Sequence, residues 1–213
     1  MNAPVGRLRR LAGARLYAIT ADIEADRILD IVPALLRGGA DVVQLRQKSI
    51  ARGDLHRLAC RLAPLVQAAG ALFIVNDHVD IAILSGADGV HLGPDDIPPA
   101  AARRIGGADL LIGASAGTPE AAREAAGAGA DYLGSGPAFA TPIKPEKQVI
   151  GPAGVALVQA SVGIPVFAIG GIDPANLDQL RAAGVSRVCM IRGFFDAPDP
   201  EATASAVRRA MTS

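Results

Sequence analysis

The chain contains no tryptophan, only two cysteines and few aromatic residues, and its formal charge is zero. Basic and acidic residues number 21 each, so the basic excess that is typical of nucleic-acid-binding proteins is missing. An aromatic content of 3% also disfavours stacking platforms for single-stranded nucleic acid. No apolar run approaches the roughly 20 residues that a membrane-spanning helix needs. Nucleic acid and membrane are therefore both disfavoured as partners.

The cysteines and the amino-terminal segment contain no recognisable site. Cys60 and Cys189 lie far apart and form no metal or redox motif, so we expect a reducing, cytoplasmic location. Residues 1–14 contain several arginines but no apolar stretch of the secretory kind, and we expect them to form a tail. Half of the 213 residues are apolar, which is enough for a sizeable core. We therefore expect one domain at residues 15–213.

Short apolar runs alternate with longer amphipathic or alanine-rich stretches along the whole chain. Eight runs are predicted strands, at 16–19, 41–45, 72–75, 89–92, 110–114, 131–134, 165–169 and 187–191. Helices are predicted at 23–37, 52–69, 79–85, 98–105, 119–128, 154–161, 174–183 and 201–211. Thr118 and Asp173 are the expected N-caps of two of these helices, each followed by proline.

A Gly-Ala-Asp tripeptide recurs where a helix is predicted to end and a strand to begin. It occurs at 39–41, 86–88 and 129–131, and Gly-Val-Ser at 184–186 is a variant of it. The glycine is the expected left-handed helix stop. The spacing corresponds to strand-helix units of a little over 20 residues, so eight units nearly fill the chain. Strand-helix alternation gives parallel strands, and eight units predict a (β/α)₈ TIM barrel.

An open, doubly wound α/β sheet is the alternative fold. Such a sheet usually has fewer strands and a glycine-rich first turn, whereas the first turn here is Thr20-Ala21-Asp22. The barrel is therefore favoured, and it places working residues at the carboxyl ends of the strands and in the loops that follow them.

Three polar residues alternate at the end of the second predicted strand. Gln44, Arg46 and Lys48 would point to the same side of an extended segment. A planar guanidinium beside an ammonium suits a phosphorylated or diphosphorylated ligand. A solvated edge strand is the alternative interpretation of this triplet.

Two carboxylates and a further cation follow other strands. Asp77 comes after the third strand, Asp96 after the fourth, and Lys144 lies in the long loop after the sixth. Mg²⁺ prefers few carboxylates, several waters and phosphate oxygens, so these residues at one rim predict a Mg²⁺-diphosphate site. Each aspartate could instead cap the helix that follows it. Gly170 and Gly171, after the seventh strand, predict a second, monophosphate site, although they could also merely shape a tight loop.

Five motifs, taken together and in order along nearly the whole chain, resemble those of the thiamine phosphate synthase family. They are Gln44-Leu-Arg46-Gln-Lys48, Asn76-Asp77, Val90-His-Leu-Gly-Pro-Asp-Asp96, Gly136-Pro-Ala-Phe-Ala-Thr141-Pro-Ile-Lys144 and Ala168-Ile-Gly-Gly171-Ile. The resemblance implies a (β/α)₈ barrel that joins 4-amino-2-methyl-5-diphosphomethylpyrimidine to a thiazole phosphate and releases diphosphate. It implies small-molecule substrates and Mg²⁺, and it permits a homo-oligomer.

The same resemblance implies a role for each site residue. The pyrimidine diphosphate would be held by Gln44, Arg46, Lys48, Asn76, Ser115 and Lys144, of which Arg46, Lys48 and Lys144 would also be catalytic. The metal would be bound by Asp77 and Asp96. The thiazole phosphate side would be lined by Thr141, Ile143, Gly171, Ile191 and Arg192.

Two positions depart from the family pattern. Ile143 stands where threonine is usual, and one missing neutral hydrogen bond of about 0.5–1.5 kcal/mol would weaken thiazole binding by roughly tenfold at most. Arg192 stands where serine is usual, and we expect its guanidinium to compensate by pairing with the thiazole phosphate.

Three alternative functions remain at this point. A thiazole tautomerase would use a histidine in the loop after the sixth strand, where this chain has Gly134-Ser135-Gly136. A non-catalytic regulator that binds thiamine precursors would not need both Asp77 and Asp96. A phosphosugar enzyme such as an epimerase would require paired acid-base residues across the barrel, and the rim offers no obvious pair.

Overall fold

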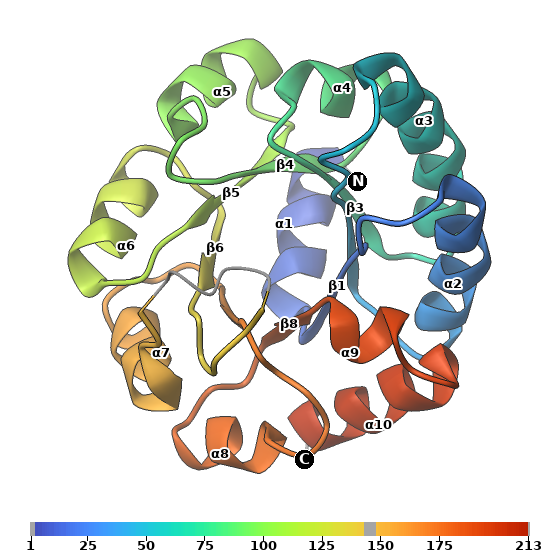
Figure 1. Cartoon of the computed structure of the whole chain (residues 1–213). Coiled ribbons are helices and arrows are strands. Elements are labelled where there is room, and N and C mark those ends of the chain that lie inside the picture. Colours follow the sequence, from blue (N-terminus) through green and yellow to red (C-terminus); the bar gives the residue numbers. More distant parts are fainter. Residues whose placement is uncertain (1–2, 143–147, 213) are drawn as a thin grey trace.

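A computed structural model describes residues 3–142 and 148–212. Its strands are all parallel and pair in sequence order, and β8 pairs with β1 to close the barrel (Figure 1). The strands are β1 (Leu16–Ile19), β2 (Val42–Leu45), β3 (Leu72–Asn76), β4 (Gly89–Leu92), β5 (Leu111–Ser115), β6 (Tyr132–Ser135), β7 (Val166–Ile169) and β8 (Val188–Met190). The predicted (β/α)₈ TIM barrel is confirmed, and a solvated edge strand at Gln44 is excluded because β2 pairs on both sides.

Helices surround the barrel and follow the strands in order (Figure 1). They are α2 (Ala25–Arg37), α3 (Arg52–Ala68), α4 (Val79–Leu84), α5 (Pro99–Gly106), α6 (Pro119–Gly127), α7 (Gly151–Ala160), α8 (Leu177–Ala182), α9 (Arg192–Phe195) and α10 (Pro200–Thr212). Thr118 caps α6 as expected, since its side chain accepts the Ala121 N–H. Asp173 does not cap α8, because that helix begins later, at Leu177, and the Asp173 carboxylate instead accepts the Ala175 N–H within the preceding turn.

The amino-terminal segment is a helix rather than the expected tail. Helix α1 (Ala3–Gly13) lies at the far end of the barrel in Figure 1. Leu11, on its inner face, and Ala14 just beyond the helix are buried, and they pack with Tyr17 and Leu72 inside the barrel. Helix α1 therefore closes the end of the barrel opposite to the carboxyl ends of the strands.

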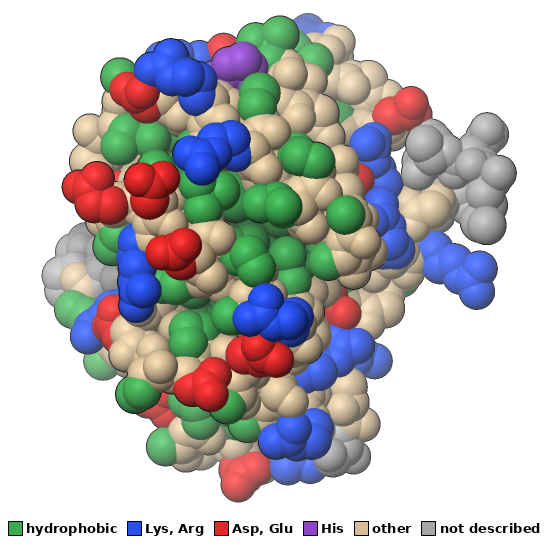
Figure 2. Space-filling view, turned by 90° about the vertical axis from the view of Figure 1, so that its right-hand side faces the viewer, with side chains coloured by type: hydrophobic (Ala, Val, Ile, Leu, Met, Phe, Trp, Pro, Cys, Tyr) green, Lys and Arg blue, Asp and Glu red, His purple; other side chains and the backbone are tan. Residues whose placement is uncertain are grey.

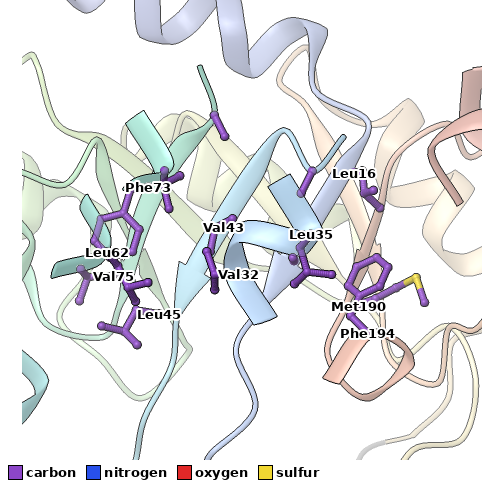
Figure 3. Packing of buried hydrophobic residues seen from close by; sticks show 14 of the residues in the cluster. Leu16, Val32, Leu35, Val43, Leu45, Leu62, Phe73, Val75, Met190 and Phe194 are labelled. Atoms are coloured by element: carbon purple, nitrogen blue, oxygen red, sulfur yellow. The ribbon is translucent and has the colours of Figure 1, made fainter. Parts of the chain in front are cut away.

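Apolar side chains fill two layers, one inside the barrel and one between the strands and the helices. Val43 of β2 lies beside Val32 of α2, and Phe73 and Val75 of β3 lie beside Leu62 of α3 (Figure 3). The strands are buried on both faces, which is why they appear in the sequence as continuous apolar runs rather than as alternating ones.

The flank that carries α2 and α3 mixes hydrophobic, acidic and basic side chains, and neither charge dominates there (Figure 2). This face gives no indication of a basic surface for nucleic acid. Among the helices of residues 3–142 and 148–212, none has the length and apolar character to cross a membrane.

The recurrent Gly-Ala-Asp tripeptides stabilise the amino-terminal end of the barrel. Their glycines Gly39, Gly86 and Gly129 have φ values of 94°, 70° and 94°, as expected for left-handed helix stops. Each aspartate accepts a backbone N–H from the preceding strand and pairs with arginine. Asp41 accepts the Leu16 N–H and pairs with Arg208. Asp88 accepts the Phe73 N–H and pairs with Arg7 and Arg10. Asp131 accepts the Ile112 N–H and pairs with Arg103.

Asp88 is the most buried of these aspartates, at 2% exposure, and we expect its loss to destabilise the fold strongly. Its carboxylate accepts hydrogen bonds from Arg7 Nε at 2.8 Å and from the Phe73 N–H at 2.9 Å. Asp88→Ala would leave these donors without their partner, which should lower the free energy of unfolding by about 2–4 kcal/mol. Urea denaturation measures this change. The control is Asp54→Ala, which breaks an exposed pair with Arg57 and should change stability by less than about 0.5 kcal/mol; equal effects would contradict the prediction.

Candidate active site

A cavity of about 860 Å³ opens at the carboxyl ends of the strands. Its walls come from the loops after β2 to β8, which are far apart in the chain. Eleven of the predicted site residues line it: Gln44, Arg46, Lys48, Asn76, Asp77, Asp96, Ser115, Thr141, Gly171, Ile191 and Arg192. The other two, Ile143 and Lys144, lie outside the described residues. The structure therefore brings the described part of the predicted set to a single opening.

The loop after β2 is held in place by the loop after β1. Thr20, which is fully buried, accepts the Arg46 N–H at 2.9 Å and donates its hydroxyl to the Arg46 carbonyl. The Gln47 amide donates to the carbonyls of Ala21 and Ile23, and the Asp22 carboxylate accepts the Lys48 N–H. Arg46 and Lys48 therefore project from an ordered backbone, although β2 itself ends at Leu45.

Asp77 lies in a strained turn at the end of β3. Its φ is 65°, and the His78 N–H donates across it to the Asn76 carbonyl at 2.8 Å. The Asp77 N–H also donates to the carbonyl of His91 on β4. A non-glycine residue with this φ costs about 1–3 kcal/mol, and such strain concentrates at functional sites. Asp77 is not the cap of α4, since His78 occupies that position.

Asp96 and Asp77 form a carboxylate pair with Lys48 beside it. Lys48 Nζ lies 3.4 Å from Asp77 Oδ2, and Asp96 Oδ2 accepts the Gly93 N–H at 2.7 Å. Burial raises the pKa of Asp96, the neighbouring Asp77 raises this pKa further, and the Gly93 N–H and Lys48 oppose the rise. Asp96 does not cap α5, which begins at Pro99. Two carboxylates that repel each other at a cavity mouth suit a hard divalent cation that keeps several other oxygen ligands.

This pair is not a complete metal cage. The described part of the chain contains no group of three or more His, Cys, Asp or Glu side chains placed to hold a metal ion. Further ligands would therefore have to come from water and from the bound substrate, which is the usual arrangement for Mg²⁺ with phosphates.

The guanidinium of Arg46 is available to a ligand. Within residues 3–142 and 148–212 its side chain makes no hydrogen bond and no ion pair, although it lines the cavity. Most arginines elsewhere on the surface have acidic partners, as Arg52 has in Asp80. A cation without a counter-ion inside a cavity favours an anionic ligand.

His91 is a cavity residue that the sequence analysis did not include in the site. His91 lines the cavity, and its Nε2 lies 3.1 Å from Ser115 Oγ. The sequence does contain a signal for the position of His91. Its neighbours Val90 and Leu92 face outward into the helix layer, so the side chain of His91, between them in the strand, points to the inside of the barrel. His91 is thus placed to orient the Ser115 hydroxyl.

The loops after β6 and β7 pack closely against each other on the other side of the cavity. The N–H groups of Ala138 and Phe139 donate to the carbonyls of Ile169 and Gly170. Gly171 has a φ of 64°, and a Cβ there would lie 2.4 Å from the Ala140 carbonyl oxygen. Glycine is therefore required at Gly171 for this packing.

Arg192 and Ile191 complete this side of the cavity. Arg192 begins α9, and its Nε lies 2.9 Å from Asp196 Oδ2, in a pair that is exposed on both sides. Arg192 therefore differs from Arg46, which has no acidic partner among the described residues, and a phosphate would have to compete with Asp196 for the Arg192 guanidinium.

The family model described as thiamine monophosphate synthase matches residues 16–194, which spans every strand of the barrel. The chain belongs to the thiamine monophosphate synthase family. A thiamine-phosphate synthase of Roseiflexus sp. is 43% identical over 94% of this chain and 86% of its own length. The solved structure of a thiamine phosphate pyrophosphorylase from Pyrococcus furiosus is 36% identical, with a TM-score of 0.85 over 96% of this chain and 97% of that one.

Two other relatives are longer than this chain. A thiamine-phosphate synthase of Thermosynechococcus vestitus is 44% identical over the whole of this chain, and one of Gloeobacter violaceus is 45% identical over 95% of it. The chain spans about 60% of the length of these two relatives. The similarity therefore covers one complete barrel.

Proposed function

We propose that the protein is a transferase that condenses 4-amino-2-methyl-5-diphosphomethylpyrimidine with thiazole phosphate to give thiamine phosphate and diphosphate. The observation that carries this proposal is that Arg46, which has no ion pair with any described residue, shares one cavity with Lys48 and the Asp77–Asp96 pair. The Arg46 guanidinium favours an anion and the carboxylate pair favours a divalent cation, and a metal-bound diphosphate supplies both. Family membership supports the same activity.

The two substrates would occupy opposite halves of the cavity. The diphosphate would meet Arg46, Lys48, Asn76 and Ser115, and the thiazole phosphate would meet Thr141, Gly171, Ile191 and Arg192. The pyrimidine ring would lie deeper, against Gln44. Ile143 and Lys144, which lie outside the described residues, are proposed to contribute to the thiazole and diphosphate sides respectively.

Asp77 and Asp96 would hold Mg²⁺. The chemistry of this donor set fits the ion, since both carboxylates face one opening and leave room for waters and phosphate oxygens. When bound, the ion supplies charge stabilisation for the departing diphosphate. The ammonium of Lys48, which pairs with Asp77, would also bind the same diphosphate.

The residues of the chain would act by binding and by fixed electrostatics. The bond between the pyrimidine methylene carbon and the diphosphate oxygen breaks, the oxygen keeps the electron pair, and the thiazole nitrogen forms a new bond to the methylene. Arg46 and Lys48 would hold the oxygen on which charge develops. The attacking ring nitrogen has a free lone pair and no proton to lose, so no general base is required.

Mixing the purified chain with both substrates and Mg²⁺ tests the proposal. We expect thiamine phosphate and diphosphate in equal amounts, and a precursor-binding regulator would give neither. A tautomerase would instead isomerise a thiazole carboxylate phosphate without forming diphosphate. The proposal places the reaction in the cytoplasm, in keeping with two cysteines that are both free.

Arg192 is expected to contribute moderately to thiazole phosphate binding. Arg192→Ala should raise the KM for thiazole phosphate by roughly 3–10-fold and leave the KM for the pyrimidine substrate unchanged, because an exposed charged hydrogen bond is worth about 1 kcal/mol. Asp196→Asn should lower the same KM, since it frees the guanidinium from its partner 2.9 Å away. Steady-state kinetics with each substrate varied in turn measures both effects. An unaltered thiazole KM in Arg192→Ala would contradict the assignment.

A further inference from the structure

Two tyrosines stand behind Gln44 inside the barrel. Gln44 Nε2 donates to the Tyr17 hydroxyl at 2.7 Å, and the hydroxyls of Tyr17 and Tyr132 are 2.9 Å apart. These hydrogen bonds join β1, β2 and β6, which are distant in the chain. Gln44 lines the cavity, whereas neither tyrosine is among the described residues that do so. The tyrosines therefore act on a ligand through side chains that line the cavity, and Gln44 is hydrogen-bonded to one of them.

Both tyrosines are held rigidly. Their rings pack edge-on against Phe167, with centroids 5.2 Å and 6.0 Å away. Tyr132 also occupies the space above Gly113, where a Cβ would lie 2.1 Å from its ring. Burial raises the pKa of both hydroxyls far above the ordinary value, so each is protonated at neutral pH.

The hydrogen bond from Gln44 fixes which amide atom faces the cavity. The Tyr17 oxygen accepts the amide N–H, and the Tyr17 and Tyr132 hydroxyls share a second hydrogen bond, in which either oxygen can be the donor. Because Nε2 is committed to Tyr17, Oε1 is the amide atom that remains for the cavity. Ile19 and Cys189, which belong to the apolar cluster inside the barrel, line the same cavity.

We infer that Tyr17 and Tyr132 are positioning residues that make Gln44 present a hydrogen-bond acceptor, and so select an amino group on the pyrimidine ring over a carbonyl. The inference rests on the proposed function. The 4-amino group is the only donor on the neutral pyrimidine ring of the proposed substrate, whereas its 4-oxo counterpart places an acceptor at that position. A site built around one buried acceptor rejects a ligand that faces it with another acceptor.

Each tyrosine variant has its own expected result. Tyr17→Phe removes the acceptor of the hydrogen bond from Gln44 Nε2, so the Gln44 amide can rotate and bind either the 4-amino or the 4-oxo compound. Tyr132→Phe removes the second hydrogen-bond partner of the Tyr17 hydroxyl, and the nearest replacement acceptor for the Tyr17 proton is Gln44 Oε1 after rotation of the amide. The NH₂ group then faces the cavity, and the preference should reverse toward the oxo compound. A tyrosine that served packing alone would not produce a reversal.

The test measures dissociation constants of 4-amino- and 4-oxo-2-methyl-5-(phosphomethyl)pyrimidine, with Mg²⁺ present. We expect the wild-type chain to prefer the amino compound by roughly 10–100-fold. Tyr17→Phe should reduce this preference to about threefold or less. Phe167→Leu is the matched control: it disturbs the packing of both rings but removes no hydroxyl, so the wild-type preference should remain even if the melting temperature falls.

Two results would overturn the inference. One is a wild-type chain without preference between the two compounds, and the other is a folded Tyr17→Phe or Tyr132→Phe variant that keeps the full preference. In either case, formation of thiamine phosphate by the wild-type chain would leave the proposed function intact. Failure of that synthesis would count against the proposed function instead.

Discussion

Asp77→Asn should lower kcat/KM for thiamine phosphate formation by about 100-fold or more, because it removes one of two proposed metal ligands. Asparagine is the sharpest substitution at this position. It has nearly the same shape as aspartate and tolerates the left-handed backbone, which the φ of 65° demands, so strain is not added. The lost charge should also weaken Mg²⁺ binding, so part of the activity should return as the Mg²⁺ concentration is raised.

Steady-state rates over a series of Mg²⁺ concentrations, with an EDTA arm, measure this effect. EDTA should abolish turnover by the wild-type chain, and added Mg²⁺ should restore it. Asp80→Asn is the matched control: Asp80 lies three residues further on and is exposed in a pair with Arg52, away from the cavity. It should change kcat/KM by less than about twofold. Full activity of Asp77→Asn in the presence of EDTA would refute the metal assignment.

Arg46→Ala should lower kcat by about 10²–10³-fold, because a fixed donor at the oxygen on which charge develops has that typical effect. The guanidinium makes no ion pair with any described residue, so its removal leaves no unpaired acid behind, and the stability of the fold should hardly change. Loss of rate without loss of stability is the signature of a residue that serves the ligand.

Arg46→Lys separates the charge from the geometry. Lysine keeps the charge but lacks the planar fork of donors, so we expect it to recover only about tenfold of the lost rate. Arg52→Ala is the control, since Arg52 binds His78 and Asp80 outside the cavity. Single-turnover rates together with thermal melts decide the matter. If Arg46→Ala kept kcat within twofold of the wild type, the leaving-group role would be wrong.

The barrel could be predicted from local patterns alone. Its strands are buried on both faces and therefore appear as apolar runs, and its helices end at recurrent glycines with positive φ. The convergence of Arg46, Asp77 and Asp96 on one opening could also be predicted, because all strands of a parallel barrel end at the same rim. The two capping alternatives for the aspartates were wrong, since α4 begins two residues after Asp77 and α5 begins three residues after Asp96.

The role of the Gly-Ala-Asp aspartates could not be predicted in the same way. The tripeptide marks the helix stop, which is a local property of its glycine. The partners of Asp88 come from α1 and β3, and those of Asp41 include Arg208 near the other end of the chain. Sequence spacing contains no information on which distant arginine reaches a given carboxylate.

By itself, the sequence determined the strand-helix order, the barrel and the rim at which its polar residues gather, because these depend on periodicity and on residues close in the chain. Only the tertiary structure decided that residues 3–13 close the barrel as a helix, that Arg46 has no acidic partner among the described residues while Arg192 has Asp196, and that Tyr17 and Tyr132 hold the Gln44 amide. The physical reason is that hydrogen bonds and ion pairs act over about 3–4 Å and depend on which side chains the closed barrel brings together.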